Sequence, residues 1–439
     1  MDDLIAAAQR ACEAAIAAGA EFADASAHRG TSLSVSLEDG AIKSSDARDS
    51  CGVSVRAYYR GGLGWYHCDG IAAKAAAEAG AAASALARQA DPDPDFKSLP
   101  QPAAYEQVEG LFDDAVAGLT IRQLIQYSVA NIEAALSVEP DGIVAGGSSA
   151  GSSESALANS LGVVAAGRSS SVSCYSRVAL RRGDEVGMFY DFDYARRLEE
   201  FDPEGLGARA AQEAAKFLGA RDIETKDLPV VFGPLASGGL LLPLAFSADA
   251  ESVQRKRSFM VGKLGQQVAS EIVTLVDDPF IPGGMASRGF DGEGTARTRL
   301  TLIEKGVLQT YLHDSYTAGK AGVQSTGHST RGGISPTNVN PELGDKTADE
   351  IIREVDEGLY MNSGGVQPNS VTGDFSSSID FAFKIENGEL AYPVKKGAMG
   401  GNIIELLKSV DAISSDYRAE PGSVMPTVRV RVARIAGGA

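Results

Sequence analysis

The chain has 439 residues, of which 44% are hydrophobic, and carries a formal net charge of −18. This length and composition favour two or three domains with sizeable cores. The negative charge argues against nucleic acid or an anionic membrane as the main partner. No apolar run of about 18 residues is present, so no membrane span is expected.

The cysteines and the first residues bear on the cellular compartment. Cys12, Cys51, Cys68 and Cys174 are scattered and lack the paired spacing of a metal site. A reduced chain is therefore expected. The sequence begins Met-Asp-Asp-Leu, which is acidic where a secretory signal is basic. We therefore expect a cytoplasmic protein.

The first half of the chain mixes helical and strand patterns. Apolar periodicity, often alanine-rich, predicts helices over residues 2–19, 72–90, 113–136 and 202–219. Strands are predicted over 25–37 and 52–59, with Asp39-Gly40 as a hairpin turn. Short strands and serine- or glycine-rich turns are expected over 137–190. With a linker near 91–105, these elements predict an N-terminal α/β domain over residues 1–225.

The second half, residues 226–439, is predicted to be mostly β. Strands are expected over residues 230–232, 381–385, 389–393 and 427–435. Helices are expected over residues 238–257, 349–358 and 402–407. The predicted class is therefore α+β, with the N-terminal α/β domain followed by a β-rich domain of barrel-like or sandwich form.

The most organised stretch is residues 287–327. It predicts a hairpin with strands over 298–303 and 307–312, joined by the turn Glu304-Lys305-Gly306. The acidic turn Asp291-Gly292-Glu293-Gly294 leads into the first strand. Turn chemistry of this kind is mostly structural, so a rigid scaffold is one interpretation.

The histidines do not form a local zinc motif. His28, His67, His313 and His328 lie outside any H-E-x-x-H pattern. His67-Cys68-Asp69 holds three ligand types in a row, but adjacent strand residues point to opposite faces. Either His313 or His328 could be an ordinary hydrogen-bonded side chain or face a substrate.

Residues 147–151 read G-S-S-A-G, which fits the G-x-S-x-G nucleophile elbow of serine hydrolases. The elbow needs a strand before Ser149 and a helix directly after it, whereas the polar pair Ser152-Ser153 predicts a turn here. A base such as His313 or His328 would also have to reach Ser149 from the other domain. A serine hydrolase is therefore the weaker alternative.

Several strings together resemble one known family. They are F-D-G-E-G-T at 290–295, L-I-E-K-G-V-L-Q-T-Y-L-H-D-S-Y-T-A at 302–318 and S-T-G-H at 325–328. With them the chain resembles the TldD/PmbA (TldD/TldE) family over nearly its whole length. The resemblance implies a cytoplasmic zinc peptidase of two subunits. One subunit, TldD, carries H-E-x-x-x-H and a later cysteine ligand, and the other, TldE or PmbA, carries neither.

Departures from the zinc-binding pattern indicate which subunit this chain is most like. An ungapped count places the H-E-x-x-x-H positions on Leu241, Leu242 and Phe246, whose apolar side chains bind no Zn²⁺. Pro243 lies in the same segment, where it is expected near a helix start. No cysteine follows Cys174. The resemblance therefore implies a metal-free TldE/PmbA-like subunit without catalytic residues, with zinc in a TldD-like partner.

Two functions agree with this resemblance and with the departures from the zinc-binding pattern. The first is a non-catalytic subunit that shapes the substrate chamber of a heterodimeric metallopeptidase acting on unfolded peptides. The second is a stand-alone or homodimeric peptide-binding protein on a degenerate peptidase fold. In either case, the residues expected to line the chamber or contact peptide are Asp291, Glu293, Ser325, Thr326, Gly327 and His328.

Overall fold

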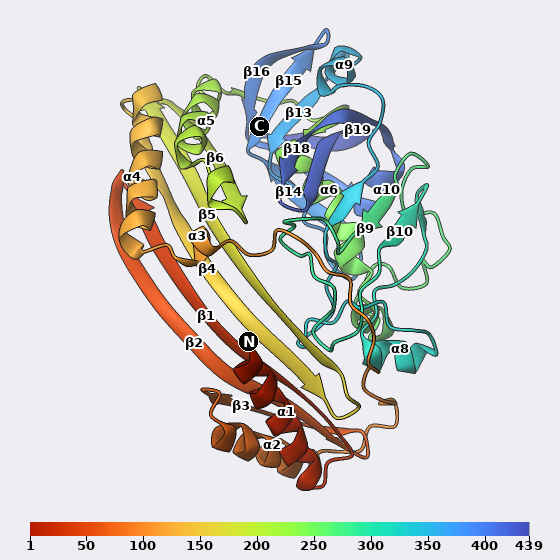
Figure 1. Cartoon of the computed structure of the whole chain (residues 1–439). Helices are drawn as coiled ribbons and strands as arrows, with labels where there is room; N and C mark the ends of the chain where they lie inside the picture. The colour runs from red at the N-terminus through yellow and green to blue at the C-terminus, as the bar shows by residue number, and fades with distance from the viewer. Residues whose placement is uncertain (439) are drawn as a thin grey trace.

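Six antiparallel strands build one long sheet in the N-terminal half of the computed structural model, which describes residues 1–438. In space the strands follow the order β3-β2-β1-β4-β5-β6. They are β1 (Phe22–Glu38), β2 (Ala41–Tyr59), β3 (Gly62–Asp69), β4 (Ile143–Asn159), β5 (Val164–Arg182) and β6 (Glu185–Ala195). Figure 1 shows the sheet curving along its length, with its concave side turned toward the C-terminal half.

The strands between residues 143 and 195 are much longer than the sequence pattern predicts. β4 has 17 residues and β5 has 19, so the prediction of short strands over 137–190 was wrong. Serine and glycine read locally as turn formers. Here β4 is bonded on both sides, to β1 and to β5, so tertiary pairing overrides that local preference.

Four helices cover the two ends of this sheet. α1 (Asp2–Ala17) and α2 (Ala73–Ala87) lie at one end, and α4 (Ile121–Val138) and α5 (Pro203–Lys216) at the other (Figure 1). The short α3 (Asp114–Ala117) and the 3-10 turn η1 (Leu198–Glu200) complete this half. α1 and α2 pack so closely that a Cβ on Gly80 would lie 2.2 Å from the carbonyl oxygen of Ala11. Glycine is therefore the residue that this contact admits at position 80.

The C-terminal half holds two further sheets. The larger contains β7 (Arg221–Asp222), β8 (Lys226–Gly233), β13 (Glu357–Ser363), β14 (Asp374–Ile379), β15 (Phe381–Glu386), β16 (Glu389–Lys395), β17 (Gly397–Asn402), β18 (Val410–Glu420) and β19 (Ser423–Gly437). The smaller contains β9 (Leu275–Asp277), β10 (Leu300–Glu304), β11 (Val307–Leu308) and β12 (Val339–Pro341). The α+β class predicted from the sequence is confirmed.

Helix α6 (Pro234–Ser247) runs through the core of the C-terminal half. Leu240, Leu241 and Leu244 on it are fully buried. The helices that follow it are α7 (Ala250–Gln254), α8 (Ser315–Ala321), α9 (Ala348–Arg353) and α10 (Ile403–Lys408). The single helix predicted over 238–257 is thus two helices, because Asp249 caps α7 by accepting N–H bonds from Glu251 and Ser252. Pro243 lies inside α6 rather than near its start.

The predicted hairpin of residues 298–312 forms with shorter strands. β10 and β11 pair through Ile303 with Leu308 and Glu304 with Val307. The turn between them is as predicted, since Gly306 has a φ of 78°. Among the helices of residues 1–438, none combines the length and the apolar character that a bilayer crossing requires.

Candidate functional site

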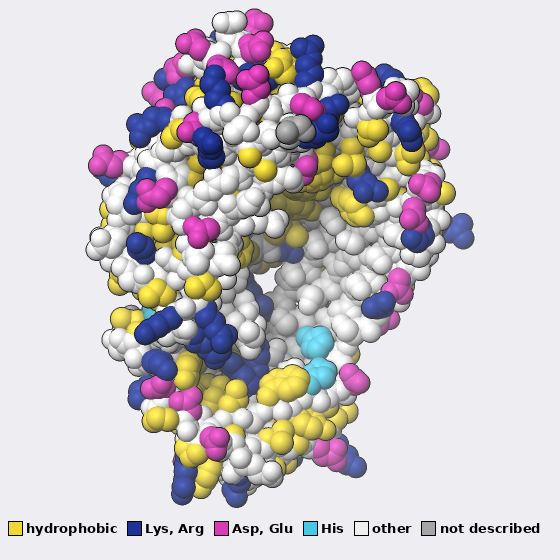
Figure 2. Space-filling model, turned by 180° about the vertical axis from the view of Figure 1, so that it is seen from behind, with side chains coloured by type: hydrophobic (Ala, Val, Ile, Leu, Met, Phe, Trp, Pro, Cys, Tyr) yellow, Lys and Arg dark blue, Asp and Glu magenta, His cyan; other side chains and the backbone are white. Residues whose placement is uncertain are grey.

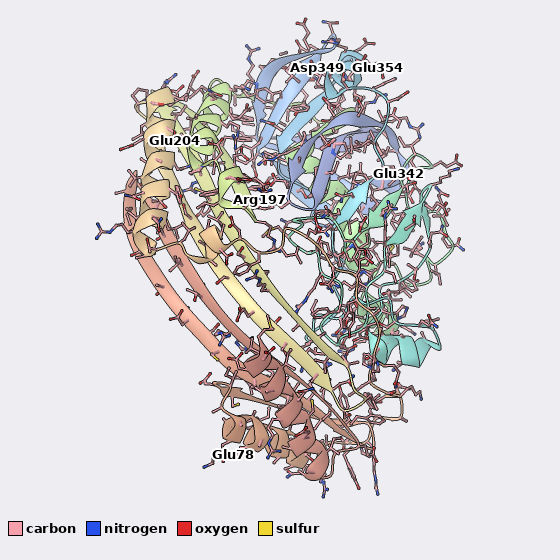
Figure 3. The ribbon with its side chains drawn as sticks, in the orientation of Figure 1. Glu78, Arg197, Glu204, Glu342, Asp349 and Glu354 are labelled. Carbon is pink, nitrogen blue, oxygen red and sulfur yellow. The ribbon has the colours of Figure 1, made fainter. Side chains whose placement is uncertain are left out.

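A hollow separates the concave face of the long sheet from the C-terminal half, and Figure 2 shows it as an opening between two lobes. Cavities of about 870, 350 and 210 Å³ are lined by residues from both halves. Arg197, which follows β6, lies on the side of the N-terminal half that faces this space (Figure 3). Binding sites are usually clefts of this kind, so the hollow is the candidate site.

An aromatic cluster joins the two halves at one end of the hollow. Phe381 on β15 lies 5.5 Å from Phe189 on β6 and 5.6 Å from Phe217, measured between ring centroids. Both rings meet Phe381 edge to face, the arrangement that aromatic quadrupoles favour. Beside them, Arg418 of β18 donates 2.7 Å and 2.6 Å hydrogen bonds to the Asp191 carboxylate and the Phe192 carbonyl. Aromatic packing and these hydrogen bonds therefore join the two halves at this end.

A buried network of charges joins the halves at the other end. The Arg56 Nη2 atom lies 2.9 Å from Asp24 on the neighbouring strand and 3.2 Å from Glu293 in the C-terminal half. Arg331 reaches Asp24 from the C-terminal half, at 2.6 Å. Burial favours the neutral form of Asp24, but the guanidinium groups of Arg331 and Arg56 outweigh it and lower the pKa of this carboxyl.

The acidic turn of residues 291–294 is buried in this junction. Asp291 is 1% exposed, and its carboxylate accepts hydrogen bonds from the N–H groups of Glu293, Thr295 and Ser329. Burial raises the pKa of both Asp291 and Glu293 above their ordinary values. Glu293 also accepts the N–H of Ser315 at the start of α8. Both carboxylates therefore hold protein segments together.

The segment Ser325–His328 lies against the same turn. Ser325 and Thr326 are half-buried, and their hydroxyl groups donate hydrogen bonds to the carbonyl of His313. Gly327 has a φ of 74° and packs against the backbone of residues 296–297. Asp291 accepts the N–H of Ser329 immediately afterwards. The structure thus brings the two predicted groups of site residues together, and their contact with peptide stays a prediction.

His328 and His313 are both enclosed by protein. His328 is fully buried, and its Nε2 atom lies 3.4 Å from the Asp277 carboxylate. His313 is within hydrogen-bond distance of the Thr317 hydroxyl, and burial lowers its pKa. Neither ring reaches Ser149, whose hydroxyl shares a 2.8 Å hydrogen bond with Ser173.

The serine motif of residues 147–151 is part of a strand. β4 runs unbroken from Ile143 to Asn159, so Ser149 has neither the sharp turn nor the following helix of a nucleophile elbow. The polar turn predicted at Ser152-Ser153 is also wrong, because both residues pair with β1 and β5. The geometry does not fit a serine hydrolase.

The three positions that match H-E-x-x-x-H lie on helix α6. Leu241 is fully buried, Leu242 is partly buried against the same core, and Phe246 is 57% exposed. Within residues 1–438 no group of three His, Cys, Asp or Glu side chains is arranged to hold a metal ion. His67 and Asp69 share one side of β3, 3.7 Å apart, while the Cys68 thiol donates toward the Ala75 carbonyl. The donor set does not fit a zinc site.

Three models of one protein family match the chain. The model of PmbA/TldA metallopeptidase domain 1 matches residues 23–87, that of the central domain matches 116–218, and that of the C-terminal domain matches 225–437. The chain belongs to the PmbA/TldD family. These matches cover the long sheet, helices α2, α4 and α5, and the C-terminal half with helix α6.

Relatives in the family carry metalloprotease names. A metalloprotease of Methanothermobacter thermautotrophicus is 33% identical over 55% of this chain and 57% of that protein. Metalloprotease PmbA of Escherichia coli O157:H7 is 28% identical over 64% of this chain and 61% of that protein. Each alignment thus spans less than two thirds of the relative.

A solved structure is similar over more of the chain than these sequence alignments are. The crystal structure of TldE from Thermococcus kodakarensis superposes with a TM-score of 0.90 at 26% identity, covering 98% of this chain and all of that one. The long curved sheet and the arrangement of the two halves are therefore features that this chain shares with TldE.

Sequence reasoning found Glu293 but missed Asp24 and Arg331, which complete the charge network. A partial signal exists at Arg56, because alternation in V-S-V-R puts Val53 and Val55 on one face and the arginine on the other. Glu293, the partner of Arg56 in the C-terminal half, lies 237 positions away. No local pattern points to a contact at that separation.

Proposed function

We propose that this chain is the non-catalytic subunit of a two-subunit zinc metallopeptidase of the PmbA/TldD family. In this proposal it forms one wall of a chamber for unfolded peptides, and a TldD-like partner supplies the zinc and the catalytic residues. The observation that carries the proposal is helix α6, where the three positions matching H-E-x-x-x-H hold Leu241, Leu242 and Phe246. Apolar side chains neither bind zinc nor activate water.

The hollow supports the chamber part of the proposal. It lies between two halves that are joined at both ends, by the aromatic cluster and by the charge network. A fixed opening of this kind favours an extended chain over a folded domain. The names of the relatives, which are metalloproteases, support peptide as the substrate class.

A peptide-binding protein that acts alone or as a homodimer is the second candidate. It is favoured by the outer edge of β2, where residues 41–50 are all exposed. β3 pairs with β2 only from Gly52 onward, and within residues 1–438 no strand covers the edge before it. An open edge can accept an extended peptide by strand addition, or a strand of another subunit.

Reconstitution separates the two candidates. The chain is purified alone and together with a family member from the same organism that carries H-E-x-x-x-H, and each sample is assayed for zinc and for peptide cleavage. We expect well under one equivalent of zinc on this chain, no cleavage by it alone, and cleavage by the pair of an unfolded protein but not of its folded form. Stoichiometric zinc on this chain, or full activity of the partner alone, would refute the subunit role.

A further inference from the structure

Four arginines from both halves of the chain surround the smallest of the three cavities, which we call the arginine pocket. They are Arg168 on β5, Arg196 just after β6, and Arg288 and Arg297 in the segment before β10. The cavity has a volume of about 210 Å³, and no aspartate or glutamate lines it. Such a concentration of positive charge stands out in a chain with a net charge of −18.

The guanidinium groups of the arginine pocket are paired with neutral groups only. Within residues 1–438, each of the four lies more than 4.0 Å from any carboxylate oxygen, since none takes part in an ion pair. Arg196 donates to the carbonyls of Ser170 and Met285, both at 2.7 Å. Arg288 donates to the Ser155 hydroxyl at 2.8 Å, and Arg297 to the Ala286 carbonyl at 3.2 Å.

Part of the hydrogen-bonding capacity in this pocket is unused. Arg196 is 7% exposed, and its Nε atom is buried without a partner. The Nε atom of Arg297 is likewise buried and unpartnered. Buried donors without acceptors cost folding free energy, and a buried charge without a counter-charge costs more. Such groups mark places where water or a bound anion can supply the acceptor.

Burial disfavours the charged form of three of these arginines. Burial lowers the pKa of Arg288 to about 10, and the neighbouring charge of Arg297 adds to the effect. Burial also lowers the pKa of Arg196 and of Arg297. The Asp291 carboxylate acts to raise the pKa of both Arg288 and Arg297, and Asp277 does so for Arg297, but neither overcomes burial. Asp291 is itself engaged by three backbone N–H groups. An anion in the pocket would remove this strain.

Serine hydroxyl groups also line the arginine pocket. Ser153 and Ser155 come from β4, and Ser169 comes from β5, all on the side of the sheet that faces Arg288. Ser153 and Arg168 are exposed, so the cavity can be entered from solvent. Figure 2 shows arginine and lysine side chains gathered beside the opening between the two lobes. Hydroxyl and guanidinium donors together are suited to an oxyanion.

We propose that the arginine pocket binds a carboxylate group of an extended peptide, supplied by its C-terminus or by an acidic side chain. Planar guanidinium groups recognise planar carboxylates through paired hydrogen bonds. The cavity is smaller than the roughly 300–1,000 Å³ of pockets that enclose whole ligands, so it takes one terminal group while the rest of the peptide lies in the hollow. The proposal rests on the peptide-binding function above and adds an anchoring point to it.

The test measures binding to the isolated full chain, so it does not depend on zinc or on a partner. A fluorescent unfolded peptide is compared in two forms, with a free C-terminal carboxylate and as the C-terminal amide, neither containing other acidic groups. A third form has the amide and one internal glutamate. We expect the amide to bind at least about tenfold more weakly than either carboxylate form, as the loss of charged hydrogen bonds implies.

Substitutions in the pocket sharpen the test. Arg297→Gln and Arg288→Lys should each weaken binding of the carboxylate peptides and leave the amide peptide unaffected. Because Arg297→Gln removes a half-buried charge that has no carboxylate within ion-pair distance, it should leave the thermal midpoint unchanged or raise it, whereas loss of a merely structural arginine would lower it. Arg299→Gln is the matched control, since Arg299 is exposed and pairs with Asp278 outside the pocket.

Three results would overturn the proposal. One is equal affinity for the acid and amide peptides, including the case in which neither binds. Another is unchanged discrimination in Arg297→Gln and Arg288→Lys. The third is binding of inorganic phosphate that depends on these arginines while the carboxylate peptides do not bind, which would assign the pocket to a phosphoryl group. A failed anchor with intact cleavage by the reconstituted pair would leave the subunit role standing.

Discussion

The guanidinium of Arg56 lies 3.2 Å from the carboxylate of Glu293, although 237 positions separate the two residues in the chain. Both side chains are almost completely buried. This ion pair, with Asp24 and Arg331 around it, ties the long N-terminal sheet to the segment that carries most of the predicted site residues. The contact should therefore contribute to the free energy of unfolding.

Asp24→Asn should lower the free energy of unfolding more than Glu293→Gln does. The fold lowers the pKa of Asp24, so it stabilises the ionised form, while it raises the pKa of Glu293. Removing the Asp24 charge leaves the guanidinium of Arg331 without a carboxylate partner and that of Arg56 with Glu293 alone, at a cost of about 3 kcal/mol at pH 7. A neutral amide at Glu293 relieves part of its burial cost. Urea unfolding of both variants measures the difference.

The pH dependence of the Asp24 effect has a definite sign. Because the folded pKa lies below the ordinary value of 3.8, the stability from Asp24 is present above that pH and is lost as the pH falls through the folded value. The gap between the wild type and Asp24→Asn should therefore close below about pH 3.8. Glu78→Gln on α2 (Figure 3) serves as control, since the pair of Glu78 with Lys74 is exposed and should contribute under about 0.5 kcal/mol.

Phe381→Ala should destabilise the protein by about 3 kcal/mol, because Phe381 is the ring on which Phe189 and Phe217 converge between the two halves. Denaturant unfolding of the full chain measures the loss. Phe246→Ala is the control: Phe246 is 57% exposed, so its removal should change the free energy of unfolding by no more than about 0.5 kcal/mol. Equal effects of the two changes would contradict the packing described here.

Gly80→Ala should be destabilising although alanine favours helix. The propensity gain in an exposed helix is about 1 kcal/mol. Against it, the new Cβ would lie 2.2 Å from the carbonyl oxygen of Ala11, so α1 and α2 would have to separate. Overpacking of this kind costs roughly 1–3 kcal/mol. A thermal midpoint at or above that of the wild type would show that the helices are less tightly packed.

Ser149→Ala should leave peptide cleavage by the reconstituted pair within about twofold of the wild type, since a positioned nucleophile contributes orders of magnitude and a strand serine does not. Within residues 1–438, the side-chain hydrogen bond of Ser149 is the one it shares with the hydroxyl of Ser173. Fluorophosphonate treatment should leave this serine unlabelled. Covalent labelling at Ser149 would restore the serine-hydrolase interpretation.

Elements set by local chemistry are those that the sequence predicted well. The turns at Asp39-Gly40 and Gly306 have the positive φ values expected of them. The alanine-rich helices over residues 2–19 and 72–90 form with boundaries shifted by no more than three residues. In these segments the backbone conformation depends on neighbours within a few positions, which the sequence contains directly.

The long strands were missed because their stability comes from pairing with distant segments. Residues 146–153 are all serine, glycine or alanine, and serine and glycine locally favour turns. In the fold, Ser149 lies opposite Ser34 on one side and Ser173 on the other. Hydrogen bonds along both edges of β4 outweigh the local preference, and the register of β1 against β4 is a tertiary property.

The sequence by itself determined the family resemblance, the α+β class and the apolar character of Leu241, Leu242 and Phe246, because each depends on which side chains are present and in what order. Only the tertiary structure decided that Glu293 meets Arg56 and that Arg168, Arg196, Arg288 and Arg297 surround one cavity. Electrostatic contacts act over a few ångströms of space rather than over positions in the chain. Until the sheet and the C-terminal half are placed together, nothing distinguishes these arginines from the ones on the surface.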